Sequence, residues 1–94
     1  MITSQIWTGA TGEDSCFALS WDGTYIYAGL YISPARIAKI DPATMLTIAT
    51  WTGAAGEDWC NDIIHAGGYI YAGLTTIPAQ VIKIDPATML TIAT

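Results

Sequence analysis

Short apolar runs, separated by turns that contain glycine, proline or aspartate, follow one another along the chain. Residues 15–21 and 24–31 are two such runs, and residues 35–41 and 45–51 are two more. No window repeats apolar residues every three to four positions, as an amphipathic helix would. Short runs bounded by turn residues are typical of β-strands. The pattern therefore predicts four strands in the first half of the chain.

The connections between these runs carry the residues that tight turns require. Asp22-Gly23 separates the first two runs, and Gly67-Gly68 separates the corresponding two runs of the second half. Both pairs favour a two-residue type I′ hairpin turn, in which both central residues have positive φ. Asp41-Pro42 follows the third run, where Asp suits the first turn position and Pro fixes φ at the second. Consecutive strands are therefore expected to pair as antiparallel neighbours.

The second half of the chain repeats the first. Trp7-Thr8-Gly9-Ala10 recurs as Trp51-Thr52-Gly53-Ala54, an offset of 44 residues. About two-thirds of the positions aligned at this offset are identical. We therefore define a first repeat, residues 7–50, and a second repeat, residues 51–94. In the second repeat strands are expected over residues 59–65, 68–75, 79–85 and 89–94.

Residues 1–6 look like the end of a further repeat. Met1-Ile2-Thr3 echoes Met45-Leu46-Thr47, so this segment is expected to form a strand like the last strand of each repeat. The chain would then offer nine strands where two blades need eight. Either the segment joins the last blade of a neighbouring copy as a clasp and displaces that blade's own last strand, or it is a linker. The near-identity of the repeats fits a recent duplication. The position of Thr94 at a repeat boundary favours an engineered or excised two-repeat piece.

Four short antiparallel strands in a unit of this length are typical of one β-propeller blade. The strand Tyr25-Ile26-Tyr27-Ala28 after an Asp-Gly turn, and then the turn Lys39-Ile40-Asp41-Pro42-Ala43-Thr44, resemble repeats of the YVTN and PQQ-like (quinoprotein-like) propellers. The resemblance covers nearly the whole chain and rests on pattern, with no catalytic motif to carry over. It implies an all-β fold with two four-stranded antiparallel blades, residues 7–50 and 51–94.

Two blades on their own would leave apolar surface bare, because both faces of a blade normally pack on neighbouring blades. Each bare face would exceed the apolar area that soluble monomers usually expose. Identical chains joined head to tail in a closed ring would cover these faces. Three chains would give six blades and four would give eight, so we expect a cyclic trimer or tetramer.

The composition and charge of the chain exclude or disfavour several classes of protein and partner. Apolar residues make up 52% of the chain and charged residues 12%, which excludes a disordered, solvated polypeptide. The net charge of −5 disfavours nucleic acid and anionic membrane as partners. The longest apolar run, residues 25–32, is far shorter than the roughly 20 residues of a membrane-spanning helix. Because residues 1–5 also lack the pattern of a signal peptide, we expect a soluble chain.

Acidic residues precede the first strand of each repeat. In a closed ring Glu13, Asp14, Glu57 and Asp58 would gather at one mouth of the central channel, with Asp62 nearby. Carboxylates brought together raise one another's pKa or bind a cation. Asp14, Asp58 and Asp62 are therefore candidate ligands for Ca²⁺ or Mg²⁺. The alternative is that Asp14 and Asp58 accept hydrogen bonds from loop amides and stay solvated.

Aromatic residues at the same rim suggest a second kind of site. Trp59 and Tyr31, together with Glu13 and Glu57, are candidate carbohydrate-binding residues. Aromatic rings stack on the apolar faces of pyranoses, and carboxylates accept hydrogen bonds from hydroxyl groups. A ring would repeat the site and raise its avidity. The alternative is that Trp59 packs at the seam between blades.

The remaining reactive side chains give no support for catalysis. Cys16 and Cys60 occupy equivalent positions and are expected to be buried, reduced thiols, with a disulfide between the blades as the alternative. His65 is the single histidine, and no nucleophile and acid stand at the spacing of a triad. We therefore expect a self-assembling structural repeat that is not an enzyme and needs no cofactor. The alternative is a multivalent binding module, with a glycan as partner.

Overall fold

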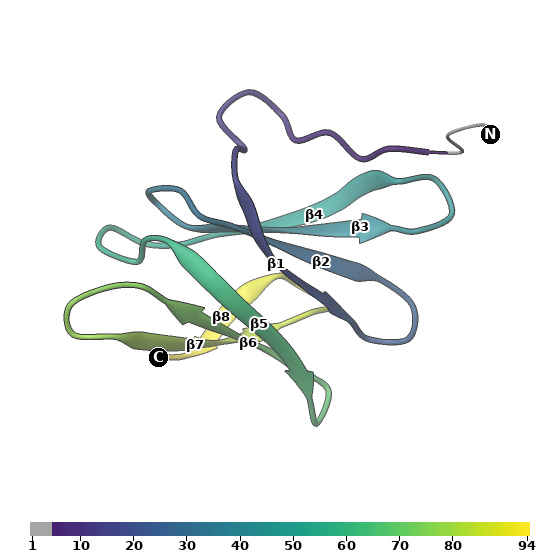
Figure 1. The fold of residues 1–94 in the computed structure, drawn as a ribbon. Helices are drawn as coiled ribbons and strands as arrows, with labels where there is room; N and C mark the ends of the chain where they lie inside the picture. The colour runs from purple at the N-terminus through teal and green to yellow at the C-terminus, as the bar shows by residue number, and fades with distance from the viewer. Residues whose placement is uncertain (1–4) are drawn as a thin grey trace.

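The computed structural model describes residues 5–94, which form two four-stranded sheets (Figure 1). The first contains β1 (Cys16–Trp21), β2 (Ile26–Leu30), β3 (Arg36–Asp41) and β4 (Leu46–Thr52), and the second contains β5 (Cys60–Ala66), β6 (Tyr69–Leu74), β7 (Gln80–Asp85) and β8 (Leu90–Ala93). Each sheet is an antiparallel meander in chain order. No helix occurs within residues 5–94. The predicted all-β fold is confirmed, and each strand ends within about two residues of its predicted position.

The N-terminal segment differs from its prediction. Of the strand expected over residues 1–6, residues 1–4 lie outside the described part of the chain, and Gln5 and Ile6 are not in a strand. The segment instead runs beside β4 (Figure 1). There Gln5 Nε2 donates a hydrogen bond to Ala43 O at 3.1 Å, and Trp7 Nε1 donates one to Thr47 Oγ1 at 2.8 Å.

The first hairpin turn also differs between the repeats. Gly67-Gly68 have φ angles of 58° and 85°, as a type I′ turn requires. At Asp22-Gly23 only the glycine has positive φ, at 95°. The predicted turn does not form there, because Asp22 Oδ1 accepts hydrogen bonds from the amides of Thr24 and Tyr25 at 2.8 and 2.7 Å. The Asp22 carboxylate thus accepts hydrogen bonds that a main-chain carbonyl accepts in an ordinary turn.

The turn before the last strand of each repeat forms as predicted. Asp41 Oδ1 accepts a hydrogen bond from Ala43 N at 2.9 Å, and Asp41 O accepts one from Met45 N at 2.7 Å. Asp85 makes the same two contacts in the second repeat. The Asp-Pro sequence therefore closes this turn in both repeats in one way.

Each sheet has two faces, because residues paired across neighbouring strands point to the same side. We call upstream the face that carries Cys16, Leu19, Ala28, Ala38 and Met45 in the first sheet and Cys60, Ile63, Ala72, Ile82 and Met89 in the second. We call downstream the face that carries Ala18, Tyr27, Gly29, Ile37 and Trp51 in the first sheet and Asp62, Tyr71, Gly73 and Val81 in the second.

The core lies where the upstream face of the second sheet packs on the downstream face of the first. Strand β5 contacts β1 and β2 across this interface (Figure 1). The approach is closest at Gly29, where an added Cβ would lie 2.7 Å from Cys60 Sγ and 2.8 Å from Ile63 Cδ1. A side chain at this position would require Cys60 or Ile63 to move. We call this closed interface the chain seam.

Polar contacts at its edges fix the chain seam. Lys39 Nζ lies 4.5 Å from the centre of the Tyr25 ring and donates a hydrogen bond to Pro86 O at 2.7 Å. At the other edge, Ala35 N donates to Glu57 O at 2.9 Å and Ala35 O accepts from Gly53 N at 2.8 Å. The loop between the repeats is therefore pinned to the start of β3.

Candidate functional site

Within residues 5–94, no second sheet packs on the upstream face of the first sheet or on the downstream face of the second, although Trp7 and Met45 cover part of the upstream one. We call these two the bare faces. On the upstream face of the first sheet, Leu19 is 68% exposed, whereas the equivalent Ile63 in the chain seam is 4% exposed. On the downstream face of the second sheet, Val81 is 60% exposed, whereas the equivalent Ile37 is fully buried. Each bare face is thus the counterpart of a face that is packed elsewhere in the same chain.

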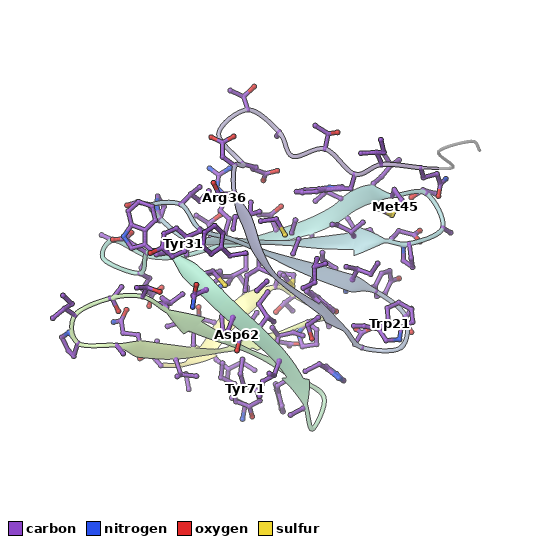
Figure 2. The ribbon with its side chains drawn as sticks, in the orientation of Figure 1. Trp21, Tyr31, Arg36, Met45, Asp62 and Tyr71 are labelled. Carbon is purple, nitrogen blue, oxygen red and sulfur yellow. The ribbon has the colours of Figure 1, made fainter. Side chains whose placement is uncertain are left out.

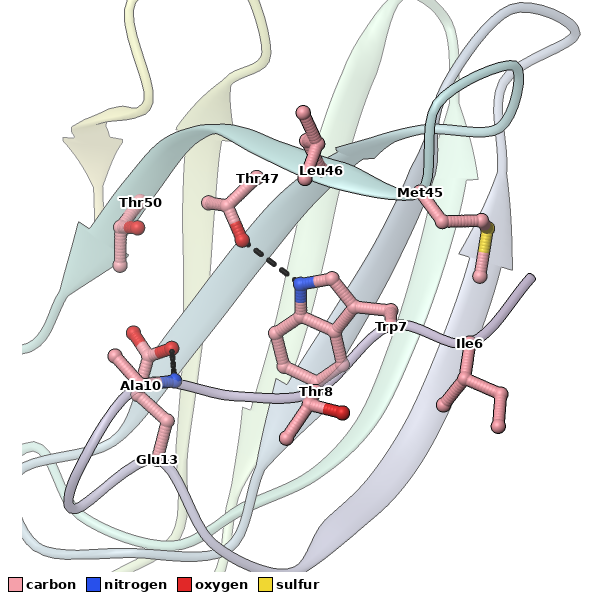
Figure 3. A pocket seen from close by; sticks show the side chains of 9 residues that line it. All are labelled: Ile6, Trp7, Thr8, Ala10, Glu13, Met45, Leu46, Thr47 and Thr50. Carbon is pink, nitrogen blue, oxygen red and sulfur yellow. Dashed lines mark hydrogen bonds between the residues drawn. The ribbon is translucent and has the colours of Figure 1, made fainter.

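The upstream bare face includes an open hollow of about 520 Å³ beside the N-terminal segment (Figure 3). Its lining combines the apolar side chains of Ile6, Met45 and Leu46 with threonine hydroxyls and the Glu13 carboxylate, and the indole of Trp7 crosses it toward Thr47. Because Glu13 Oε1 accepts from Ala10 N and Thr47 Oγ1 accepts from the indole, these polar groups are already engaged, and the open hollow resembles an unfilled packing surface more than an enclosed ligand pocket.

The downstream bare face has a smaller hollow of about 180 Å³. Gly73 lies in it, with no atom within 4 Å of the place where a Cβ would stand. Asp62 and Tyr71 line the same hollow, and Figure 2 shows both on the open side of the second sheet. The equivalent space at Gly29 is filled by the side chains of Cys60 and Ile63.

Aromatic side chains form a row at one rim of the chain seam. The Phe17 and Tyr31 rings are stacked with centroids 4.5 Å apart, and the Tyr31 and Trp59 centroids are 5.2 Å apart. Figure 2 shows Tyr31 at the edge of the molecule. Trp59 N donates to Ile32 O at 2.9 Å, which holds the row against the first sheet. The structure therefore brings together the two predicted aromatic site residues and adds Phe17.

Beside Trp59 lies a third hollow, of about 350 Å³. It is lined by Gly56, Asp58, Trp59, Thr75, Thr76 and Ile77. Its lining includes one aromatic residue, one carboxylate and two threonines, and it is the most polar of these hollows. Thr76 Oγ1 donates a hydrogen bond to Pro78 O at 2.9 Å, and Asp58 Oδ1 accepts one from Ser33 Oγ.

The predicted glutamates are engaged in their own loops. Glu13 Oε1 accepts a hydrogen bond from Ala10 N at 2.9 Å, and its Oε2 lies 3.6 Å from Arg36 Nη1. Glu57 Oε1 accepts a hydrogen bond from Ala54 N at 2.8 Å. These carboxylates therefore shape the loops before β1 and β5, and they do not face the aromatic row.

The predicted cation ligands do not gather within one chain. Asp58 Oδ1 accepts a hydrogen bond from Ser33 Oγ at 2.9 Å, and Asp62 Oδ1 accepts one from Ile63 N at 2.9 Å. Among residues 5–94 no group of three or more His, Cys, Asp or Glu side chains could hold a metal ion. A Ca²⁺ or Mg²⁺ site that draws Asp14 from several copies stays a prediction.

The two cysteines, expected to be alike, differ. Both thiols are free, so the alternative of a disulfide does not apply. Cys60 is fully buried in the chain seam, and this burial raises the pKa of its thiol to about 11. Cys16 is exposed, which corrects the expectation that it is buried. The reason is that, within residues 5–94, no second sheet packs over Cys16, whereas Trp7 and Met45 cover only the part of this face where Ala28, Ala38 and Ile40 are buried.

One polar cluster has no counterpart in the sequence analysis. Tyr27 is fully buried, and its hydroxyl donates a hydrogen bond to Asp22 Oδ2 at 2.7 Å. Partial burial raises the pKa of Asp22, but hydrogen bonds from Tyr25 N, Tyr27 and Thr24 N outweigh it and hold the pKa below its ordinary 3.8. Burial, with this carboxylate beside it, raises the pKa of Tyr27 well above its ordinary value. The cluster closes the end of the first hairpin and faces no cavity.

No protein-family model matches the chain, and no curated protein is significantly similar to it. No helix in the described residues 5–94 has the length and hydropathy to span a membrane. The function must therefore be argued from the comparison of the two repeats with each other.

Proposed function

We propose that this chain is a structural scaffold that joins copies of itself head to tail into a closed β-propeller ring of six or eight blades, without catalysis. One observation carries the proposal. The downstream face that is bare in the second sheet is the face that the chain seam buries in the first sheet, and the reverse holds for the upstream face. A second copy can therefore repeat the chain seam with surfaces that the chain already packs once. Interfaces of this head-to-tail kind close into rings when the rotation allows.

The main-chain groups that form hydrogen bonds across the chain seam have equivalents on both bare faces. The loop before β1 already has the conformation of the loop before β5: Glu13 N donates to Ala10 O at 2.8 Å, as Glu57 N donates to Ala54 O at 2.9 Å. Ala79, the equivalent of Ala35, is exposed. In the ring, its N–H would donate to Glu13 O of the next copy, and its carbonyl would accept from the next copy's Gly9 N.

An edge strand supports the same join. Ile37 of β3 pairs with Trp51 at the end of β4, whereas β8 pairs with β7 only from Lys83 to Asp85 and, within residues 5–94, leaves Val81 without a partner on that side. Trp7 makes the side-chain hydrogen bond to Thr47 that Trp51 makes to Thr91, at 2.8 and 2.9 Å. Trp7 of the next copy therefore matches Val81, as Trp51 matches Ile37. Exposed strand edges readily accept such an added strand.

Lys83 has the same local environment as Lys39, which forms a hydrogen bond across the chain seam. Lys83 Nζ lies 4.2 Å from the centre of the Tyr69 ring, as Lys39 Nζ lies over Tyr25, but within residues 5–94 it makes no hydrogen bond like that of Lys39 to Pro86. Pro42 is the equivalent of Pro86. In the ring, Lys83 would donate to the Pro42 carbonyl of the next copy.

The subunit count tests the ring directly. Native mass spectrometry and light scattering after size-exclusion chromatography should give a mass of about 30 or 40 kDa, three or four times the 10.0 kDa chain. A folded 10 kDa monomer at micromolar concentration would contradict the proposal.

A disulfide trap tests the geometry of the join. At Gly29 a Cβ would lie 2.7 Å from Cys60 Sγ, so Gly73→Cys should place a thiol equally close to Cys16 of the next copy. Mild oxidation should then give a ladder of covalent oligomers on a non-reducing gel that ends at the ring number.

Two controls accompany the trap. Gly29→Cys should bond to Cys60 within one chain and give no ladder, because both residues lie in the chain seam. Gly73→Cys combined with Cys16→Ser should also give no ladder. A ladder that persists without Cys16 would mean that the copies meet through other surfaces.

A further inference from the structure

The aromatic row of Phe17, Tyr31 and Trp59 fills one rim of the chain seam. The row fills the space where the loop before β5 meets the loop after β2, since Trp59 N donates to Ile32 O and Tyr31 N donates to Ser15 O. No ligand could enter the rim at this point without displacing one of these rings.

At a seam between two copies, the same three positions carry small or polar residues. The 44-residue offset aligns Phe17 with Asn61 and Tyr31 with Thr75, and it aligns Trp59 with Ser15 of the next copy. Three aromatic rings are thus replaced by an amide and two hydroxyl groups. Replacing three large side chains with small ones while the backbone positions repeat leaves an open notch.

The hollow of about 350 Å³ beside Trp59 lies at this rim. Trp59, Asp58, Thr75 and Thr76 line it, and Ile77 at its edge is fully exposed. The chain-seam contact of Trp59 N with Ile32 O has as its counterpart Ser15 N of the next copy with Thr76 O. The next copy would therefore supply the wall that the isolated chain lacks.

We propose that this notch, completed by Ser15 of the next copy, binds a monosaccharide unit of a carbohydrate. The inference rests on the proposed ring and adds its ligand. A pyranose stacks its apolar C–H face on an aromatic ring and offers its hydroxyl groups to carboxylate and hydroxyl partners. Trp59 supplies the aromatic ring. Thr75 supplies a hydroxyl group, Asp58 supplies the carboxylate oxygen that Ser33 does not bond, and Thr76, whose hydroxyl donates to Pro78 O, supplies an acceptor. A closed ring of copies would carry one such site at each seam between two copies, so that a branched or surface-bound glycan is bound with avidity.

The test uses the full chain and defined probes. Binding of glucose, galactose, mannose, fucose and N-acetylglucosamine is measured by saturation-transfer NMR, and binding of their oligosaccharides on a glycan array, with the subunit count recorded by native mass spectrometry on the same sample. At least one sugar should bind, with the strongest saturation transfer at the C–H protons of the face that stacks on Trp59.

Two variants sharpen the test. Trp59→Ser removes the stacking ring at a position with φ of 60°, and Ser15 occupies the equivalent position with φ of 54°, so the backbone accepts serine there. The affinity for the sugar should fall at least about tenfold, while the subunit count of the assembly stays the same. Ser15→Trp places at the seam between copies an indole like that of Trp59 in the chain seam, and it should abolish sugar binding. Thr24→Ala, at an exposed position in the turn after β1 and outside the hollow, should leave sugar binding unchanged.

The outcomes separate the two proposals. An intact ring that binds none of these sugars, or that binds them equally well after Trp59→Ser, overturns the carbohydrate site and leaves the ring standing. A monomeric chain overturns the ring and the shared notch with it.

Discussion

The two repeats share most of their sequence, yet the same residues stand in opposite environments. Residues 39–50 and 83–94 are identical, but Met89 is 2% exposed while Met45 is only half-buried. Trp51 is likewise buried, and Trp7 is half-buried with the same indole hydrogen bond. The difference teaches that the strand pattern sets which side chains share a face, whereas a neighbouring sheet decides whether that face is buried.

The comparison also separates contacts that belong to one blade from those that belong to a seam. The cation–π pair of lysine and tyrosine and the Asp-Pro turn occur in both repeats, so they need no neighbour. The hydrogen bonds of Ala35 and Lys39 to the second repeat occur once, because only one seam exists in the chain. In a closed ring of copies, every seam would contain these hydrogen bonds.

The largest effect is expected at the paired tryptophans. Trp51→Ala should lower the free energy of unfolding by about 3–5 kcal/mol, because it empties a buried site and removes the hydrogen bond to Thr91. Trp7→Ala should have a similar effect only above the concentration at which the ring forms. Urea denaturation of both variants across a dilution series measures this. An equally large loss for Trp7→Ala in dilute, monomeric chains would remove the distinction between the repeats.

The next effect concerns the paired glycines. Gly29→Ala places a methyl group against Cys60 and should destabilise the chain by about 1–3 kcal/mol through overpacking. Gly73→Ala has open space around it in the single chain and should leave the stability of the chain unchanged while it weakens association. Thermal melting and native mass spectrometry of the two variants give the two readouts. Normal association of Gly73→Ala would show that this face is not used.

A smaller effect is expected at the cluster that only the first repeat has. Asp22→Ala should lower stability by about 1–2 kcal/mol, because the amides of Thr24 and Tyr25 and the Tyr27 hydroxyl lose their acceptor. The folded-state pKa of Asp22 lies below 3.8, so its contribution is present above about pH 4 and is lost as the pH falls further.

The pH profile checks this assignment. Between pH 5 and pH 2 the stability of Asp22→Ala should fall less steeply than that of the unmodified chain. Substituting the equivalent Ala66 with Ser should leave the profile unchanged, because Ala66 accepts no such hydrogen bonds through a side chain. Parallel profiles for Asp22→Ala and the unmodified chain would contradict the assignment.

The last prediction concerns thiol reactivity and involves no change in stability. Burial holds the pKa of Cys60 at about 11, above the ordinary 9.0, so its thiol should resist labelling at pH 8 until the chain unfolds. Cys16 is exposed in the single chain and should react rapidly there. In the ring it should become protected. Labelling by a chromogenic disulfide reagent at several chain concentrations measures both, and fast labelling of Cys16 at every concentration would count against the ring.

The sequence predicted the strands well because their signals are local. Turn residues such as Asp41-Pro42 act within a few residues, and the repeat offset transfers each prediction to the second half. The exception, Asp22-Gly23, arose because a carboxylate can bond nearby amides instead of forming the expected turn. The exposure of Cys16 was not predicted, because burial depends on which sheet lies opposite.

The candidate sites follow the same division. Sequence alone selected Trp59 and Tyr31, and the tertiary structure brought their rings to 5.2 Å and added Phe17 to the row. It also bound the carboxylates of Glu13 and Glu57 into their loops. Such contacts join residues far apart in sequence or depend on loop geometry, and no local pattern encodes them.

By itself the sequence determined an all-β chain of two equal four-stranded units, since alternating apolar runs and turn residues act through neighbours along the backbone. Only the tertiary structure decided that one upstream face packs on one downstream face and that the other two stay bare. The physical reason is that burial is a property of paired surfaces, and two sheets in one chain can form a single seam. Which surfaces close the remaining pair is the question that the subunit count and the Gly73→Cys trap answer.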